Sequence, residues 1–210
     1  MPIVKTSRTA GATPCRRIVA GGGAVLFAAL VAGCAGASAP KAFYDLSARA
    51  TPVEGRARLQ TQVLVPVPRA IRALDTSSIA VRPSQQTLSY YGGVQWADSL
   101  PKLVQVAVVQ SLEDSGRVRA VGLPGEGLLI NYQLPMEIRA FELQTDGRSR
   151  AVVEISAMVL NDSNGQVVAR RVFTGEAASG SDEPGAAVRA MDAALKQVLD
   201  ELVPWALAQI

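Results

Sequence analysis

Apolar and polar residues alternate along the chain with a period that changes from two to about 3.6 and back. Between residues 59 and 67 most odd positions are apolar, which predicts a half-buried strand that ends at the prolines Pro66 and Pro68. Two shorter apolar runs, 79–82 and 87–91, predict a second pair of strands. The first third of the domain is therefore expected to be mostly β-structure.

The period changes between residues 100 and 112. Here apolar residues recur every three or four positions, which predicts an amphipathic helix. Asp98 or Ser99 is expected to cap its start, with Pro101 in the first turn, and Gly116 is expected to end it.

Alternation returns at residues 128–140, where apolar residues occupy the even positions and predict the clearest strand of the chain. Phe141 and Leu143 switch the apolar phase, which indicates a bulge near Ala140. The pair Asp146-Gly147 follows and is typical of a hairpin turn.

The next strand, 151–160, is apolar on both faces, so it is predicted to be central in the sheet and covered by helices. A turn at 161–165 and a returning strand at 167–174 complete a meander. A loop rich in glycine and serine, 175–185, leads to a final helical stripe at 188–202.

Pro204 is expected to end or kink this last helix. The order of elements is strands, a helix, three meandering strands and a helix. This order predicts an α+β fold: a single domain over residues 44–210, with a mainly antiparallel sheet and two helices packed on one face.

The chain begins with the features of an export signal. Residues 18–33 are uncharged and apolar or small, and they follow the basic pair Arg16-Arg17. At about 1.5 Å per residue this stretch spans roughly 24 Å, which is short of a hydrocarbon core of about 30 Å. We therefore predict that residues 1–33 are a removed signal peptide, exported by the general secretory route, with twin-arginine export as the alternative.

The signal ends in Leu30-Val31-Ala32-Gly33-Cys34, which resembles the lipobox of bacterial lipoproteins. The resemblance implies that Cys34 carries a diacylglycerol and an N-acyl chain, followed by a flexible tether, residues 34–43. The alternative is an ordinary secretory leader that leaves Cys34 as a free thiol. By resemblance to the sorting signal of enteric lipoproteins, Ala35 favours the outer membrane, periplasmic face, over the inner membrane.

Composition excludes several classes of function. Residues 1–33 hold four of the 21 basic residues and none of the 18 acidic ones, so the remaining chain is close to neutral and is not expected to bind nucleic acid. The chain contains no histidine, which rules out a Ser-His-Asp triad, a Cys-His dyad and an imidazole metal site. We predict no enzyme, no metal and no cofactor other than the lipid on Cys34.

Most of the mature chain resembles the ABC-type transport auxiliary lipoproteins, the family of the Pqi-system outer-membrane lipoprotein. The most specific element is Tyr-Tyr followed by Trp-Ala-Asp before the first helix. The chain departs from the family at Gly127-Leu128 and Ser99. The matching segments are 44–46, 65–68, 79–82, 88–91, 96–101, 112–116 and the C-terminal helix.

The resemblance implies a non-catalytic lipoprotein that works with an ABC-type lipid transporter carrying a mammalian-cell-entry (MCE) domain protein. Such a lipoprotein would dock on the MCE assembly and couple it to the outer membrane, and a homo-oligomeric ring is also compatible with it. The alternative is a structural or assembly lipoprotein of the outer membrane without a transporter partner.

The candidate partner-binding residues are Tyr90, Tyr91, Trp96 and Asp98, because aromatic side chains are enriched at interface hot spots. The simpler interpretation is that the aromatic residues cover the end of the sheet and that Asp98 caps a helix. The segment 122–127 is rich in glycine but precedes a strand and lacks a following Lys-Ser/Thr, so it is expected to be an ordinary loop.

Overall fold

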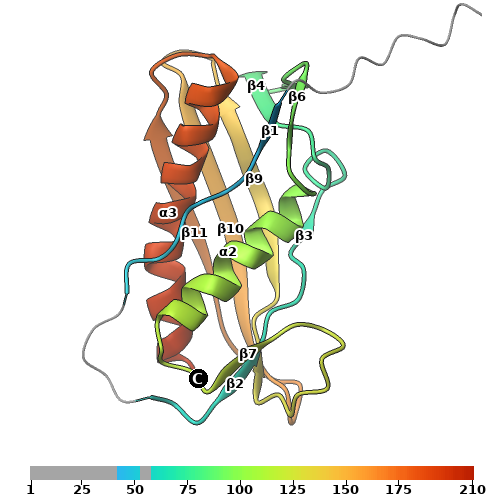
Figure 1. The fold of residues 1–210 in the computed structure, drawn as a ribbon, viewed down its shortest axis with the longest axis vertical. Helices are drawn as coiled ribbons and strands as arrows, with labels where there is room; N and C mark the ends of the chain where they lie inside the picture. Colours follow the sequence, from blue (N-terminus) through green and yellow to red (C-terminus); the bar gives the residue numbers. More distant parts are fainter. Residues whose placement is uncertain (1–41, 53–57) are drawn as a thin grey trace, which may run out of the picture. The chain divides into compact units, whose positions relative to one another are not determined.

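The computed structural model describes residues 42–52 and 58–210 (Figure 1). The predicted signal peptide, Cys34 and nearly all of the tether lie outside the described residues. Along the chain the elements are β1 (Ala42–Tyr44), β2 (Gln62–Leu64), β3 (Arg69–Ala70), β4 (Ala80–Ser84), β5 (Thr87–Tyr90), β6 (Val94–Trp96), α2 (Leu100–Asp114), β7 (Ala120–Gly122), β8 (Tyr132–Gln133), β9 (Met136–Gln144), β10 (Arg150–Asn161), β11 (Val167–Ala178) and α3 (Pro184–Ala208).

The predicted α+β class is confirmed. In the described part of the chain, strands β2 to β5 and β7 to β11 form one nine-stranded sheet, and β1 pairs with β6 separately. The long strand β10 lies in its middle and pairs antiparallel with β8, β9 and β11. The short strands β2, β3, β4 and β7 add parallel pairs, so the sheet is mixed.

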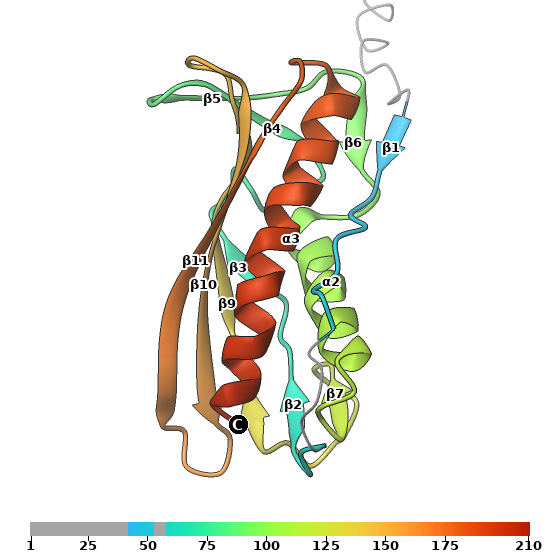
Figure 2. The same cartoon turned by 90° about the vertical axis from the view of Figure 1, so that its left-hand side faces the viewer.

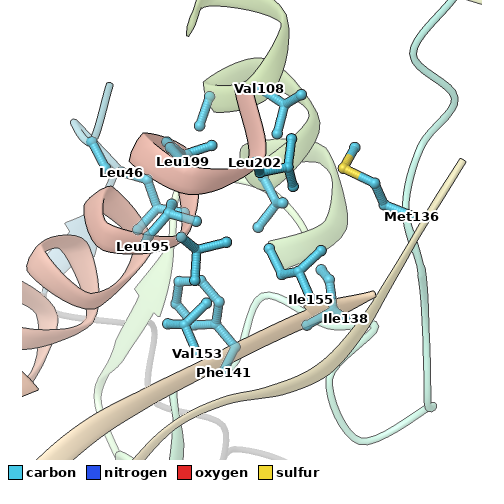
Figure 3. Packing of buried hydrophobic residues seen from close by; sticks show 14 of the residues in the cluster. Leu46, Val108, Met136, Ile138, Phe141, Val153, Ile155, Leu195, Leu199 and Leu202 are labelled. Carbon is cyan, nitrogen blue, oxygen red and sulfur yellow. The ribbon is translucent and has the colours of Figure 1, made fainter. Parts of the chain in front are cut away.

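Helices α2 and α3 lie on the same face of the sheet (Figure 2). The odd-numbered residues of β10 face them and are buried, which follows from the two-residue period of a strand. Leu195, Leu199 and Leu202 of α3 pack toward Phe141, Val153 and Ile155 of the sheet (Figure 3). A buried side chain of this size contributes about 1.5–3 kcal/mol relative to an exposed one, so this layer stabilises the fold.

The predicted strand over 128–140 is wrong in two respects, because residues 128–131 are not part of a strand and the structure divides the rest into β8 and β9. The break falls at Leu134 and Pro135. Proline has no N–H to donate to a ladder, and here the chain passes from the β2 side of the sheet to the β4 side. The bulge near Ala140 is confirmed: Glu154 pairs with Ala140 but Ile155 pairs with Ile138, which leaves one extra residue on β9.

Of the two outcomes expected at Pro204, an end or a kink, an end of the last helix is wrong. Helix α3 continues through it to Ala208. Ala206 and Leu207 are buried beyond the proline, so packing of the last turn outweighs the missing backbone hydrogen bond.

Strand β11 extends past its predicted end at Thr174 to Ala178, so the predicted loop 175–185 is shorter than expected. Gly175 explains why the sequence suggested a loop there. A Cβ at this position would lie 2.1 Å from the carbonyl oxygen of Ala194 in α3, so glycine is needed for the helix to approach the strand.

Candidate partner-binding site

The four residues predicted to bind a partner lie at one end of the domain, the end at which the described chain begins. Tyr90 and Tyr91 lie at the end of β5, Trp96 ends β6, and Asp98 precedes α2. Strand β6 pairs in parallel with β1, and both lie beside the start of α3 (Figures 1 and 2). The structure therefore brings the four residues to one region, although only some of their side chains reach the surface.

Trp96 supports this region from inside, because its side chain is only 1% exposed. Its ring packs edge-on against Phe141, with 5.9 Å between the ring centroids. Its backbone N–H donates to the carbonyl of Ser77 at 2.8 Å. Among the described residues the indole Nε1–H has no acceptor, and an unsatisfied buried donor costs about 1–3 kcal/mol.

The two tyrosines differ in exposure. Tyr90 is 45% exposed, and its hydroxyl donates to the carbonyl of Ala73 at 3.0 Å. The hydroxyl of Tyr91 donates to the carbonyl of Asp182 at 2.7 Å. Burial, together with the carboxylates of Asp182 and Glu183, raises the pKa of Tyr91 to about 12. Tyr91 therefore ties β5 to the loop before α3, whereas Tyr90 is available to a partner.

Asp98 is not the helix cap that was predicted. Ser99 occupies the N-cap position of α2, without a capping hydrogen bond from its side chain. The carboxylate of Asp98 instead accepts the N–H of Ser99 at 2.6 Å and lies 3.5 Å from the Lys102 ammonium. The other end of α2 is as predicted: Gly116 follows the C-cap with a φ of +60°.

Ser99 and Lys102 have the Ser-x-x-Lys spacing of hydrolases that work without histidine, a motif that sequence inspection missed. A lysine base needs a buried environment that disfavours its charged form. Lys102 is instead more than half exposed and paired with Asp98. The spacing therefore does not make a catalytic site.

A segment that the sequence did not single out fastens the start of the domain to α3. We call residues 45–51 the strap. The carboxylate of Asp192 accepts the backbone N–H groups of Ser47 and Ala48, both at 2.8 Å, and the Ser47 hydroxyl at 2.7 Å. Leu46, Ala48 and Ala50, which alternate along the strap, are buried against the core. This alternation of buried residues at every second position is the sequence pattern from which the strap could have been predicted.

Asp200 holds the far end of the strap. Its carboxylate accepts the N–H of Thr51 at 2.6 Å and binds the Lys196 ammonium at 2.8 Å. Burial acts to raise the pKa of Asp200, but the hydrogen bonds from Lys196 and Thr51 outweigh it, so its pKa lies below its ordinary value.

A buried ion pair joins β4 to β9. Glu142 is 2% exposed, and both of its oxygens bond the guanidinium of Arg82, one through Nη2 at 3.0 Å. The amide of Gln144 donates to the same carboxylate at 3.3 Å. The hydrogen bond to Glu142 raises the pKa of Arg82. Since β4 and β9 share only two register pairs, the ion pair supplies much of their connection.

The described residues offer little for other chemistry. Within residues 42–52 and 58–210, His, Cys, Asp and Glu side chains form no group of three or more that could hold a metal ion. None of the helices in this part of the chain is long and apolar enough to cross a membrane. The region around Tyr90 does present an exposed aromatic side chain.

The region thus combines a buried aromatic residue, Trp96, with an exposed one, Tyr90, on an α+β domain. The chain belongs to the family of ABC-type transport auxiliary lipoprotein components, whose model matches residues 44–203. This confirms the family resemblance found in the sequence.

Individual relatives agree with this assignment. The chain is 33% identical over 175 residues to the uncharacterized protein bll6063 of Bradyrhizobium diazoefficiens, a match that covers 83% of this chain and 47% of the relative. The chain therefore spans about half the length of that curated relative.

Two solved structures are similar as well. The crystal structure of protein XCC0632 from Xanthomonas campestris is 34% identical, with a TM-score of 0.73, covering 80% of this chain and 95% of that one. A crystal structure of an uncharacterized protein at 15% identity and a TM-score of 0.61 covers 79% of this chain and 98% of that one, and shares the fold alone.

Proposed function

We propose that the protein is a non-catalytic adaptor of an MCE-type ABC lipid-transport system, which docks on the MCE assembly and couples it to the outer membrane. The observation that carries this proposal is the family match over residues 44–203, which begins directly after the predicted tether. The whole described domain, rather than a local motif, is thus the part shared with transport auxiliary lipoproteins.

The predicted anchor supports the membrane side of this role. Each buried methylene of an acyl chain contributes about 0.8 kcal/mol, so the chains on Cys34 would hold the protein at the membrane. The tether that follows, residues 34–43, reaches no more than about 36 Å even when fully extended. The domain would therefore work close to the periplasmic face of the outer membrane.

The strap supports the coupling part of the role. The chain that leaves the tether forms β1 and then runs as the strap, which Asp192 and Asp200 bond to α3. A force on the lipid anchor would thus act on α3, which is longer than α2, through the strap and not on a loop. An adaptor that joins a transporter to a membrane needs such a connection.

Binding rather than catalysis agrees with the side chains present. The chain has no histidine, and Lys102 is exposed and ion-paired rather than activated. The contact residues predicted from the sequence, Tyr90, Tyr91, Trp96 and Asp98, stay a prediction. Of these, Tyr90 is the aromatic side chain that a partner could reach directly.

The test uses the full-length chain co-expressed with the MCE-domain protein encoded in the same genome. The membranes are solubilised in mild detergent and the lipoprotein is captured by an affinity tag. We expect the MCE-domain protein to be recovered in stoichiometric amount. Recovery of a lipidated, folded lipoprotein without it would refute the proposal and favour a structural lipoprotein of the outer membrane.

Cys34→Ser is the matched variant for the anchor. We expect it to leave the membrane fraction and still to bind the MCE-domain protein, because the described domain is unchanged. Unaltered membrane fractionation of this variant would contradict lipidation at Cys34.

A further inference from the structure

A second exposed surface lies at the opposite end of the domain from Tyr90. It consists of apolar side chains on the loop between β7 and β8 and at the start of β11. We call this set the apolar tip: Leu123, Leu128, Leu129, Val167 and Val168. The two parts flank the end of β10, because its Leu160 pairs with Gln133 of β8 on one side and with Val167 of β11 on the other.

Hydrogen bonds from Gln62 of β2 and within the loop itself hold the loop of the apolar tip in place. The Gln62 side chain donates to the carbonyl of Leu129 at 2.9 Å, and the Gln62 backbone N–H donates to the Asn131 side chain at 2.8 Å. Glu126 accepts the N–H of Leu123 at 2.8 Å. These hydrogen bonds fix the backbone before and after Leu129.

The two adjacent leucines have different roles. Leu128 folds back, and its Cδ1 occupies the space beside Gly122, 2.7 Å from where a Cβ would lie. Leu129 points outward and is 85% exposed. A leucine this exposed gains almost none of the about 1.5–3 kcal/mol that burial provides, so folding does not account for it. Clustered exposed apolar residues mark interaction surfaces.

The position of the chain start decides what this surface faces. Strand β1 lies at one end of the domain and β2 and β7 lie at the other in both views (Figures 1 and 2). The Tyr44 hydroxyl lies beside Gly185 at the start of α3, and the 25 residues of α3 span about 38 Å toward the other end. The tether therefore attaches at the end remote from the apolar tip.

We propose that the apolar tip docks on the MCE-domain protein, with Leu129 inserted into an apolar recess of that partner. The inference rests on the proposed function and assigns the transporter contact to the end away from the membrane. A protein occupies this surface rather than the bilayer, because the tether attached at the β1 end reaches at most about 36 Å. This reach is less than the about 38 Å that α3 spans toward the apolar tip, so the β1 end stays nearer the membrane.

The test compares two aspartate variants of the full-length chain for binding to the MCE-domain protein of the same genome. Leu129→Asp alters the apolar tip, and Ile71→Asp is the matched control near Tyr90, where the isoleucine is 59% exposed. We expect Leu129→Asp to weaken the affinity about tenfold or more, as a hot-spot residue does, and Ile71→Asp to change it less than twofold. Leu129→Ser serves as a second variant at the same position, and a thermal unfolding scan of each variant shows whether it is folded.

The outcomes separate the two proposals. Loss of binding in Ile71→Asp but not in Leu129→Asp would overturn this inference and leave the adaptor function standing. Absence of binding by the unaltered chain would overturn both.

A photo-crosslinking residue at position 129 of the full-length chain, activated in cells, gives an independent reading. A crosslink to the MCE-domain protein supports the proposal. A crosslink to lipid, or to a second copy of this chain, overturns it.

Discussion

Gly175 is the residue at which the contact between helix and sheet is most sensitive to a single atom. A Cβ on Gly175 would lie 2.1 Å from the Ala194 carbonyl oxygen, 3.0 Å from its carbonyl carbon and 3.2 Å from Cγ2 of Val198. The nearest obstacle is helix backbone, which cannot rotate away as a side chain can. Gly175→Ala therefore forces α3 and β11 apart.

The size of the effect follows from this geometry. Contacts below 3.0 Å are essentially absent for real Cβ atoms, so the helix must move by about 0.9 Å at this point. The displaced turn carries Ala194, Leu195 and Val198, all fully buried. Overpacking usually costs about 1–3 kcal/mol, and a rigid backbone obstacle places Gly175→Ala at the upper end of that range or beyond. For a domain of this size, about 3 kcal/mol lowers Tm by roughly 6–12 °C.

The assay is thermal and urea unfolding of purified protein, followed by circular dichroism. Gly180→Ala is the matched control, because no atom lies within 4 Å of its Cβ position and its φ is not positive. We expect the control to stay within about 0.5 kcal/mol of the unaltered protein. Equal stability of the two variants would refute the close approach of α3 to β11.

Three further predictions concern polar contacts. Arg82→Ala leaves the buried Glu142 carboxylate with Gln144 as its remaining hydrogen-bond partner. It should lower the free energy of unfolding, measured by urea titration, by about 3 kcal/mol. The double variant Arg82→Ala, Glu142→Leu should recover part of this loss. The neutral phenol of Tyr91 stabilises the fold fully below pH 10, and this contribution should decrease as the pH rises toward the pKa of Tyr91, about 12. Alkaline unfolding of Tyr91→Phe should therefore lack this pH-dependent loss of stability. Asp192→Ala removes three hydrogen bonds and should expose the strap to limited proteolysis, whereas unchanged cleavage would show that Leu46, Ala48 and Ala50 hold it alone.

The sequence pattern predicted the parts of the fold whose signals are local. The β9–β10–β11 meander, the bulge near Ala140 and the start of α2 each depend on neighbouring residues, and each is confirmed. Pro204 was misjudged because a local rule was weighed without the packing of Ala206 and Leu207, which only the tertiary structure reveals.

The candidate surfaces were harder to predict, because they depend on contacts between distant residues. Glu142 belongs to a buried ion pair only because Arg82, 60 positions earlier, lies beside it on β4. The predicted loop at 122–127 is confirmed except for Gly122, which ends β7, yet the connection is also fixed by a hydrogen bond to the carbonyl of Leu129 from Gln62, 67 positions away. Neither Arg82 nor Gln62 lies in a periodic sequence pattern from which its contact could have been predicted.

The distance between the two ends constrains how the domain can act. In the proposed arrangement, a membrane at the β1 end and a protein at the apolar tip are separated by a distance close to the length of α3, about 38 Å. The hydrogen bonds of the strap and the packing of α3 on β11 lie along the path between these ends. A variant that loosens α3, such as Gly175→Ala, should therefore impair transport in cells more than it impairs binding of the isolated MCE-domain protein, because binding needs only the apolar tip whereas coupling needs the whole path.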